Sequence, residues 1–178
     1  MRTGGEYPSP EELTTAANIL GRLPSGRLPL GIFLQFSRLA TLSVVEVVPL
    51  NRTPELNVLL LQRPDDDPYW PSVWHSPGSI ILPTDREGTT YQDAIERVIR
   101  GELRNPKILR GPIQFGNGIN KEERGTAAWV GFWVEVTEAP VGEFFSVDRL
   151  PENLIKGHTE LIDAAARSFR KRLLMNES

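Results

Sequence analysis

The clearest hydrophobic pattern in this chain lies between positions 90 and 103. Apolar residues recur there at helical intervals, at Tyr91, Ala94, Ile95, Val98, Ile99 and Leu103. This spacing predicts an amphipathic helix with one buried face. Thr90 to Asp93 resembles a capping box with aspartate in place of glutamate, and Asn105–Pro106 ends the pattern.

Patterns typical of strands lie on both sides of this helix. Thr41–Leu50 and Glu55–Gln62 are rich in β-branched residues and leucine, and Asn51–Pro54 suits a turn, so a hairpin is expected. A short extended piece is expected between Trp70 and Ile81. Later strands are expected at Gln114–Phe115 and Ala127–Val136, with turns at Gly116–Gly118 and Glu122–Gly125.

Helices are also expected near both ends of the chain. Ser9 and Glu12 have the spacing of a capping box, and the helix that they begin is expected to reach about Leu23. The apolar segment Leu30–Phe36 fits a strand as well as a helix. Leu161–Phe169 predicts an amphipathic C-terminal helix. We interpret residues 1–39 as an N-terminal extension packed on a domain formed by residues 40–178.

The order of these elements is helix, strands, helix, strands and helix. It predicts an α+β fold, a sandwich in which helices cover both faces of a mixed sheet. The chain has 178 residues, 39% of them hydrophobic, which is the size and apolar content of one domain.

Charge and composition exclude several classes of function. The chain has 20 basic and 23 acidic residues, and its net charge of -3 gives no general attraction for a nucleic-acid polymer or an anionic membrane. It has no cysteine, which excludes disulfides, thiolate metal sites and a cysteine nucleophile. Without a signal core or an apolar run of roughly 18 residues, it is expected to be a soluble cytoplasmic protein.

Four segments, in this order along the chain, resemble the Nudix hydrolase superfamily. Val58–Arg63 is similar to the strand that precedes the Nudix box, and Trp74–Ser79 (Trp-His-Ser-Pro-Gly-Ser) is similar to the loop that leads into it. Ala94–Leu103 resembles the box helix, and Phe144–Leu154 resembles the acidic leucine–proline turn that closes the domain. The resemblance implies a Nudix-like α/β/α sandwich with a mixed central sheet, preceded here by an N-terminal helical extension.

The Nudix box reads G-x5-E-x7-R-E-U-x-E-E-x-G, where U is aliphatic, and this chain matches it in part. Aligned on Arg97, the box gives Ile99 the aliphatic position and Glu102 the last glutamate. The positions of its first glycine and its other glutamates are held by Ser79, Thr89, Val98 and Gly101. An insertion lies within Leu82–Gly88, so the box is degenerate.

In the family, carboxylates of the box helix hold Mg²⁺ or Mn²⁺ on a diphosphate, and the arginine orients them. The resemblance therefore gives Glu102 and Arg97 the catalytic positions, with Glu102 as a metal ligand. Asp85 and Glu87 in the insertion are candidate substitute ligands. Glu102 is equally well an exposed or arginine-paired helix carboxylate. Arg97 can pair with Glu102, pair with an acid of a loop, or be solvated.

Other residues suit a phosphorylated, aromatic ligand. The candidate ligand-binding residues are Arg63, Trp70, Trp74 and Arg124. The arginines are placed to meet a phosphate, and the tryptophans, in a proline-rich loop, are placed to stack on a ring. His75 and His158 can act in acid–base chemistry only with a partner that the sequence does not identify.

Two functions agree with these features. The first is a metal-dependent hydrolase of nucleoside diphosphate-linked or related pyrophosphate compounds, with reduced or altered activity and a need for Mg²⁺ or Mn²⁺. The alternative is a catalytically inactive domain, with no cofactor, that senses a nucleotide ligand or binds another protein. The loss of box carboxylates favours the alternative. Both imply a small-molecule nucleotide or diphosphate ligand, and the sequence leaves a homodimer open.

Overall fold

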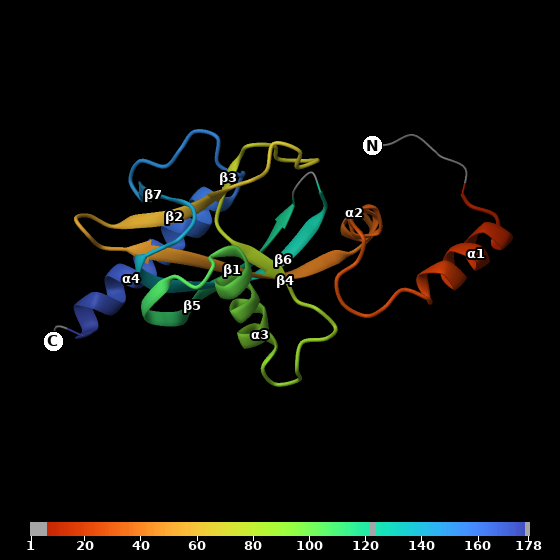
Figure 1. Ribbon diagram of the computed structural model, residues 1–178, viewed down its shortest axis with the longest axis horizontal. Helices are drawn as coiled ribbons and strands as arrows, with labels where there is room; N and C mark the ends of the chain where they lie inside the picture. The colour runs from red at the N-terminus through yellow and green to blue at the C-terminus, as the bar shows by residue number, and fades with distance from the viewer. Residues whose placement is uncertain (1–6, 122–123, 177–178) are drawn as a thin grey trace.

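One mixed β-sheet forms the centre of the computed structural model, which describes residues 7–121 and 124–176 (Figure 1). Its strands are β1 (Thr41–Asn51), β2 (Asn57–Gln62), β3 (Trp74–His75), β4 (Gly78–Ile80), β5 (Lys107–Lys121), β6 (Thr126–Glu138) and β7 (Glu143–Ser146). They pair in the order β3-β2-β1-β6-β5, with β4 added to β1 and β7 to β2. β1 and β6 are parallel, and the other pairs are antiparallel. The predicted hairpin of β1 and β2 is confirmed.

Helices cover both faces of this sheet. Alternate residues of a strand point to opposite faces. Val45 and Val47 of β1 pack in one core with Ala94 of α3 (Thr90–Arg97). Val48 packs in a second core with Phe169 of α4 (His158–Asn176). The predicted α+β sandwich with a mixed sheet is therefore confirmed.

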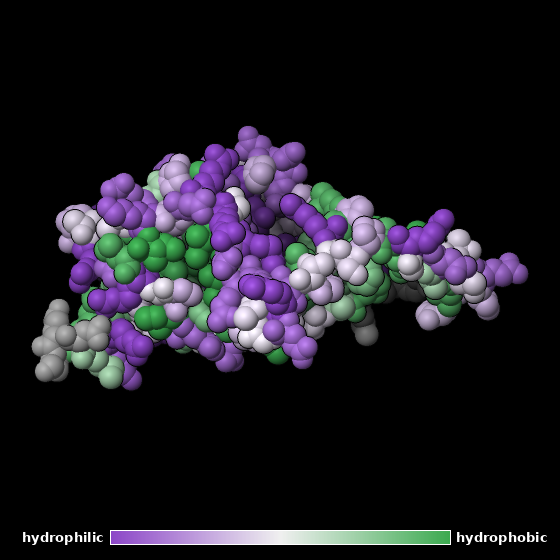
Figure 2. All heavy atoms as spheres, turned by 60° about the horizontal axis from the view of Figure 1, so that its bottom comes forward, coloured by the Kyte–Doolittle hydropathy of each residue, from purple (hydrophilic) through white to green (hydrophobic). Residues whose placement is uncertain are grey.

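Two helices, α1 (Pro10–Leu20) and α2 (Leu30–Leu39), form an N-terminal arm. The predicted capping box of α1 is confirmed, because Glu12 N donates to Ser9 Oγ at 3.2 Å and Ser9 N donates to Glu12 Oε2 at 2.8 Å. α1 has no buried residue, and Figure 2 shows the arm projecting from the body of the molecule. The segment that fitted a strand or a helix is α2, which contacts β1 and buries Ser37.

The start of α3 differs from the prediction. Its N-cap is Thr89, whose side chain makes no capping bond, so the capping box expected at Thr90–Asp93 is wrong. The Asp93 carboxylate instead accepts hydrogen bonds from the backbone of Arg86 at 2.8 Å and from its guanidinium at 2.6 Å. The Asp93 carboxylate therefore binds Arg86 of the insertion and does not cap the start of α3.

The turn expected at Gly116–Gly118 is also wrong, because these residues lie within β5. A Cβ on Gly118 would lie 2.9 Å from the ring of Trp129, so the glycine makes room for an aromatic side chain on the neighbouring strand. The turn expected at Glu122–Gly125 lies partly outside the described residues.

α3 continues directly into a π-helical turn, η1 (Val98–Glu102). Leu103 N donates to Val98 O at 2.9 Å, a bond that spans five residues. The helix then ends where Arg104 and Asn105 adopt φ values of 53° and 58°, as the following proline predicted. Within the described residues, no helix is both long and apolar enough to cross a membrane.

Candidate functional site

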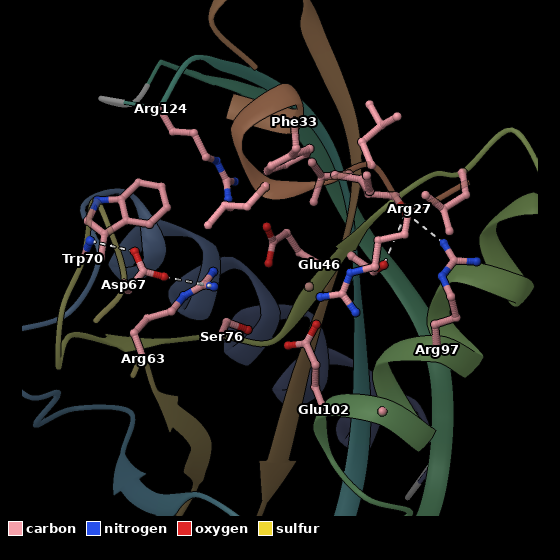
Figure 3. A pocket seen from close by; sticks show the side chains of 18 of the residues that line it. Arg27, Phe33, Glu46, Arg63, Asp67, Trp70, Ser76, Arg97, Glu102 and Arg124 are labelled. Atoms are coloured by element: carbon pink, nitrogen blue, oxygen red, sulfur yellow. Dashed lines mark hydrogen bonds and ion pairs between the residues drawn. The ribbon is translucent and has the colours of Figure 1, made fainter. Parts of the chain in front are cut away.

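A cavity of about 1230 Å³ opens between the N-terminal arm and the sheet (Figure 3). Its walls come from α2, β1, the loop after β2, β4, and the helix formed by α3 and η1. The candidate residues that line it are Arg63, Trp70, Asp85, Arg97, Glu102 and Arg124. The cavity also contains Arg27, Phe33 and Glu46, which were not predicted from the sequence.

Glu46 reaches this cavity because its neighbour across the sheet is a glycine. Glu46 lies on β1, directly opposite Gly78 of β4. A Cβ on Gly78 would lie 2.6 Å from Glu46 Oε2 and 2.9 Å from Glu46 Cδ, closer than packed side chains come. Glu46 is the only acid in the apolar run Val44–Leu50, and that isolated charge was the feature that could have identified it.

The π-helical turn directs Glu102 toward the same place. In a regular α-helix, Glu102 would lie about 140° around the axis from Arg97, five residues earlier. In a turn closed by bonds from residue i to residue i+5, residues five apart lie on nearly the same side. η1 therefore brings Glu102 to the side of the helix that carries Arg97, and both line the cavity.

The pKa of the Glu102 carboxyl lies near neutrality. Burial raises its pKa to about 7, although Arg63, a hydrogen bond from the backbone of Gly78, and Arg27 act in the opposite direction. Figure 3 shows Glu46 and Glu102 facing the same part of the cavity. Gly78 thus lies beside both carboxyl groups.

The chemistry of these two side chains fits a hard divalent cation. Mg²⁺ and Mn²⁺ prefer oxygen ligands, and Mg²⁺ is commonly held by one or two carboxylates together with phosphates of a substrate. Across the described ranges, no group of three or more histidine, aspartate and glutamate side chains forms a metal cage. A cation held by Glu46 and Glu102 would therefore need further oxygen ligands, such as those of a bound phosphate.

Arg97 anchors the insertion to the sheet. Its guanidinium pairs with the Asp85 carboxylate and donates to Ile80 O at 2.8 Å. Asp85 also accepts a hydrogen bond from Leu82 N at 2.8 Å, and its side chain is only 3% exposed. The arginine thus pairs with a loop acid, one of the two partners considered from the sequence. Glu87 is exposed and is not among the residues that line the cavity.

Two buried histidines fix the loop between β3 and β4. Ser76 N donates to His158 Nδ1 at 2.9 Å, and the Ser76 carbonyl lies 2.9 Å from His75 Nδ1. Because a carbonyl only accepts, His75 carries its proton on Nδ1, whereas His158 carries its proton on Nε2. Burial lowers the pKa of His75 to about 3 and that of His158 to about 4, so both rings are neutral at pH 7. They hold the loop in place rather than transfer protons.

A rigid turn carries Trp70 at the other end of the cavity. Asp67 Oδ1 accepts hydrogen bonds from Tyr69 N at 3.0 Å and Trp70 N at 2.9 Å. Burial acts to raise the pKa of Asp67, but these bonds and the cations Arg63 and Arg124 lower it overall. The carboxylate therefore stays charged and keeps the turn closed.

Trp74 lies away from the cavity. Its ring packs edge-on against Phe145, with 5.0 Å between the ring centroids. Its backbone N donates to Asn153 O at 2.9 Å and its carbonyl accepts from Ile155 N at 2.9 Å. Trp74 thus joins the β3–β4 loop to the segment that closes the domain.

Comparisons with known proteins support the fold described above. No family model and no curated protein sequence matches the chain. Its structure is similar to the NUDIX domain of Shewanella oneidensis NrtR complexed with ADP ribose, at 20% identity over 86% of this chain and 97% of that chain, with a TM-score of 0.53. It is also similar to a mutT/nudix family protein from Listeria innocua, at 16% identity over 75% of this chain and 97% of that chain, with a TM-score of 0.54.

A longer structure shares the same fold. NrtR of Shewanella oneidensis complexed with a 27mer DNA is 19% identical over 72% of this chain and 62% of that chain, with a TM-score of 0.54. At these identities the similarities establish the fold. The chain has the Nudix fold, as the resemblance in its sequence predicted.

Proposed function

We propose that this Nudix-fold protein is a metal-dependent hydrolase of nucleoside diphosphate-linked compounds. The observation that carries the proposal is the placement of Glu46 and Glu102 beside Gly78, in a cavity that arginines line. Glu46 supplies from β1 a carboxylate that the box lacks at Val98 and Gly101. The complex of the NrtR domain with ADP ribose supports a ligand of this class.

The residues of the cavity have distinct roles in this proposal. Arg27 and Arg63 act electrostatically on Glu102, and the same cations would neutralise a diphosphate bound beside it. Glu46 and Glu102 would hold Mg²⁺ or Mn²⁺, which supplies a polarised phosphoryl group and a more acidic bound water. Burial raises the pKa of Glu102 to about 7, and a cation bound there would favour the charged carboxylate that holds it. Arg97 is a positioning residue that acts through Asp85.

The test is hydrolysis by the purified chain. Nucleoside diphosphate derivatives, ADP-ribose among them, are incubated with Mg²⁺ or Mn²⁺, and release of the nucleoside monophosphate is measured by chromatography. We expect Glu46→Gln and Glu102→Gln each to lower the rate about 100-fold. Glu87→Gln is the matched control, because it makes the same change at an exposed residue outside the cavity.

Binding without turnover overturns the hydrolase proposal. If the compounds bind in calorimetry but none is hydrolysed with either metal, a catalytically inactive domain that senses a nucleotide or acts as an interaction module takes its place. If none of them binds, the ligand class is wrong as well. Full activity of Glu46→Gln would remove that residue from the mechanism.

We further propose a small molecule, rather than a nucleic-acid polymer, as the partner. The net charge of -3 opposes nonspecific binding to phosphate backbones. The DNA complex of NrtR involves a chain of which this one covers 62%. A homodimer stays a prediction, which light scattering coupled to size-exclusion chromatography tests directly.

A further inference from the structure

We propose that Phe33 and Trp70 form a clamp for a flat heteroaromatic ring, the nucleobase of the ligand, and that Arg124 fills this clamp when the ligand is absent. The inference rests on the proposed function for the class of ligand, and it adds where the base binds. Figure 3 shows the guanidinium of Arg124 between the two rings.

The distances suit an aromatic ring at this position. Arg124 Cζ lies 5.0 Å from the centroid of the Trp70 ring and 5.7 Å from that of the Phe33 ring. Aromatic rings that pack well have centroids roughly 4.5–7 Å apart. A ring centred where Cζ now lies would therefore contact both aromatic side chains. The guanidinium itself is flat and weakly hydrated, and it commonly stacks on aromatic faces.

The Trp70 side of the clamp is fixed by its own turn. Asp67 Oδ1 holds the backbone N–H of Trp70 at 2.9 Å, and the Asp67 carboxylate lies 3.7 Å from Arg63. The Tyr69 ring packs beside Trp70, with 5.9 Å between the centroids. Trp70 is therefore held in the cavity before any ligand arrives, which lowers the entropy lost on binding.

The Phe33 side is fixed by contact between α2 and the residue after Arg124. A Cβ on Gly125 would lie only 1.8 Å from Ser37 O, so the two backbones meet there. Ser37 is buried, and its Oγ donates to Phe33 O at 3.0 Å. The backbone of Gly125 is thus held next to the helix turn that carries Phe33. In this proposal the side chain of Arg124 moves out of the clamp when the base binds, and both rings stay in place.

The clamp adjoins the place proposed for the phosphates. Arg63 Cζ lies 5.8 Å from the Trp70 centroid, and Arg63 also acts electrostatically on Glu102. A base held against Trp70 would therefore direct its phosphates past Arg63 toward the carboxylates. A flat ring bearing phosphates fits this arrangement better than an inorganic phosphate does.

The test compares a ligand that has a base with one that lacks it. The dissociation constants of ADP and inorganic pyrophosphate are measured by calorimetry with Mg²⁺ on the full chain. We expect ADP to bind about 10-fold more tightly than pyrophosphate. Phe33→Leu and Trp70→Leu are each expected to remove most of this preference. Phe36→Leu is the matched control, because Phe36 is on the same helix but outside the cavity.

Arg124→Ala tests whether Arg124 fills the clamp or only stabilises the structure. Removing the guanidinium weakens both ligands through lost charge, but it also vacates the clamp, so the preference for ADP is expected to rise about 3-fold. Thermal melts establish that each variant is folded. Phe33→Leu and Trp70→Leu test the clamp independently, because each removes a different ring. Equal binding of ADP and pyrophosphate by the unmodified chain would overturn the clamp alone. Failure of both to bind would overturn the proposed function with it.

Discussion

At the scale of single residues, Glu102 makes stability depend on pH in an unusual direction. Its pKa in the folded chain is about 7, above the ordinary value of 4.5. Between these pH values the folded chain keeps a proton that the unfolded chain has released. The free energy of unfolding therefore falls as the pH rises toward 7, by at most roughly 3 kcal/mol.

Glu102→Gln is expected to remove this pH dependence. Measured by urea denaturation, the free energy of unfolding of the variant relative to the unmodified chain should rise by roughly 2 kcal/mol between pH 5 and pH 8. His75 and His158, whose lowered pKa values make the folded chain less stable in acid, are present in both proteins and cancel in the comparison. Parallel pH profiles would mean that the carboxyl is ionised as easily in the folded chain as in water.

Gly78→Ala is expected to lower the rate of hydrolysis but to change the stability of the fold only slightly. The new Cβ would lie 2.6 Å from Glu46 Oε2, which is the end of a flexible side chain, so Glu46 can turn away at a cost of about 1 kcal/mol. The carboxylate would then leave the proposed metal site. We expect hydrolysis to fall at least about 10-fold while the melting temperature changes little.

The control for this substitution is Gly31→Ala, because a Cβ at Gly31 meets no atom within 4 Å. It should leave hydrolysis unchanged and should not lower the melting temperature, because alanine favours a helix more than glycine does. If Gly78→Ala remained fully active in the same assay, the position of Glu46 against Gly78 would have no bearing on catalysis.

At the scale of elements, the contact between Asp85 and Arg97 controls the insertion. Asp85→Asn removes the charge that holds Arg97 but keeps an oxygen for Leu82 N. Local opening of the loop should then become about 10-fold more frequent. Hydrogen–deuterium exchange of the backbone amides in residues 82–88, followed by mass spectrometry, measures this opening. Glu87→Gln should exchange like the unmodified chain, and equal exchange rates in all three proteins would contradict the anchoring role.

Local patterns predicted most of these elements, and long-range contacts explain the rest. The apolar spacing from Tyr91 to Leu103 identified the helix, but it could not reveal η1. Leu103 follows Ile99 by four residues and Val98 by five, so an α-turn and a π-turn both place it on the apolar face. Glu46 was missed because its place in the cavity depends on Gly78, which β-sheet pairing brings opposite it. The capping box at Thr90–Asp93 failed because Arg86 offered the carboxylate a charged partner.

The candidate site was predictable where the Nudix resemblance assigns a position. Arg63, Arg97 and Glu102 all line the cavity. Phe33 and Arg27 belong to the N-terminal arm, which has no counterpart in the box pattern, so no motif could place them there. A tertiary contact, the approach of Gly125 to Ser37, brings that arm to the site.

At the scale of the whole molecule, the two helices of the arm are expected to have separate roles. α1 buries no residue, so deletion of residues 7–22 should change the free energy of unfolding by no more than about 0.5 kcal/mol and leave ADP affinity unchanged. Deletion of residues 7–39 also removes α2, with Phe33 and the buried Ser37, and should weaken ADP binding about 10-fold or more and lower the melting temperature. Thermal melts and calorimetry compare the two. If the shorter deletion destabilised the protein as much as the longer one, α1 would have to act through contacts with a second copy of the chain, because its own chain buries none of its residues.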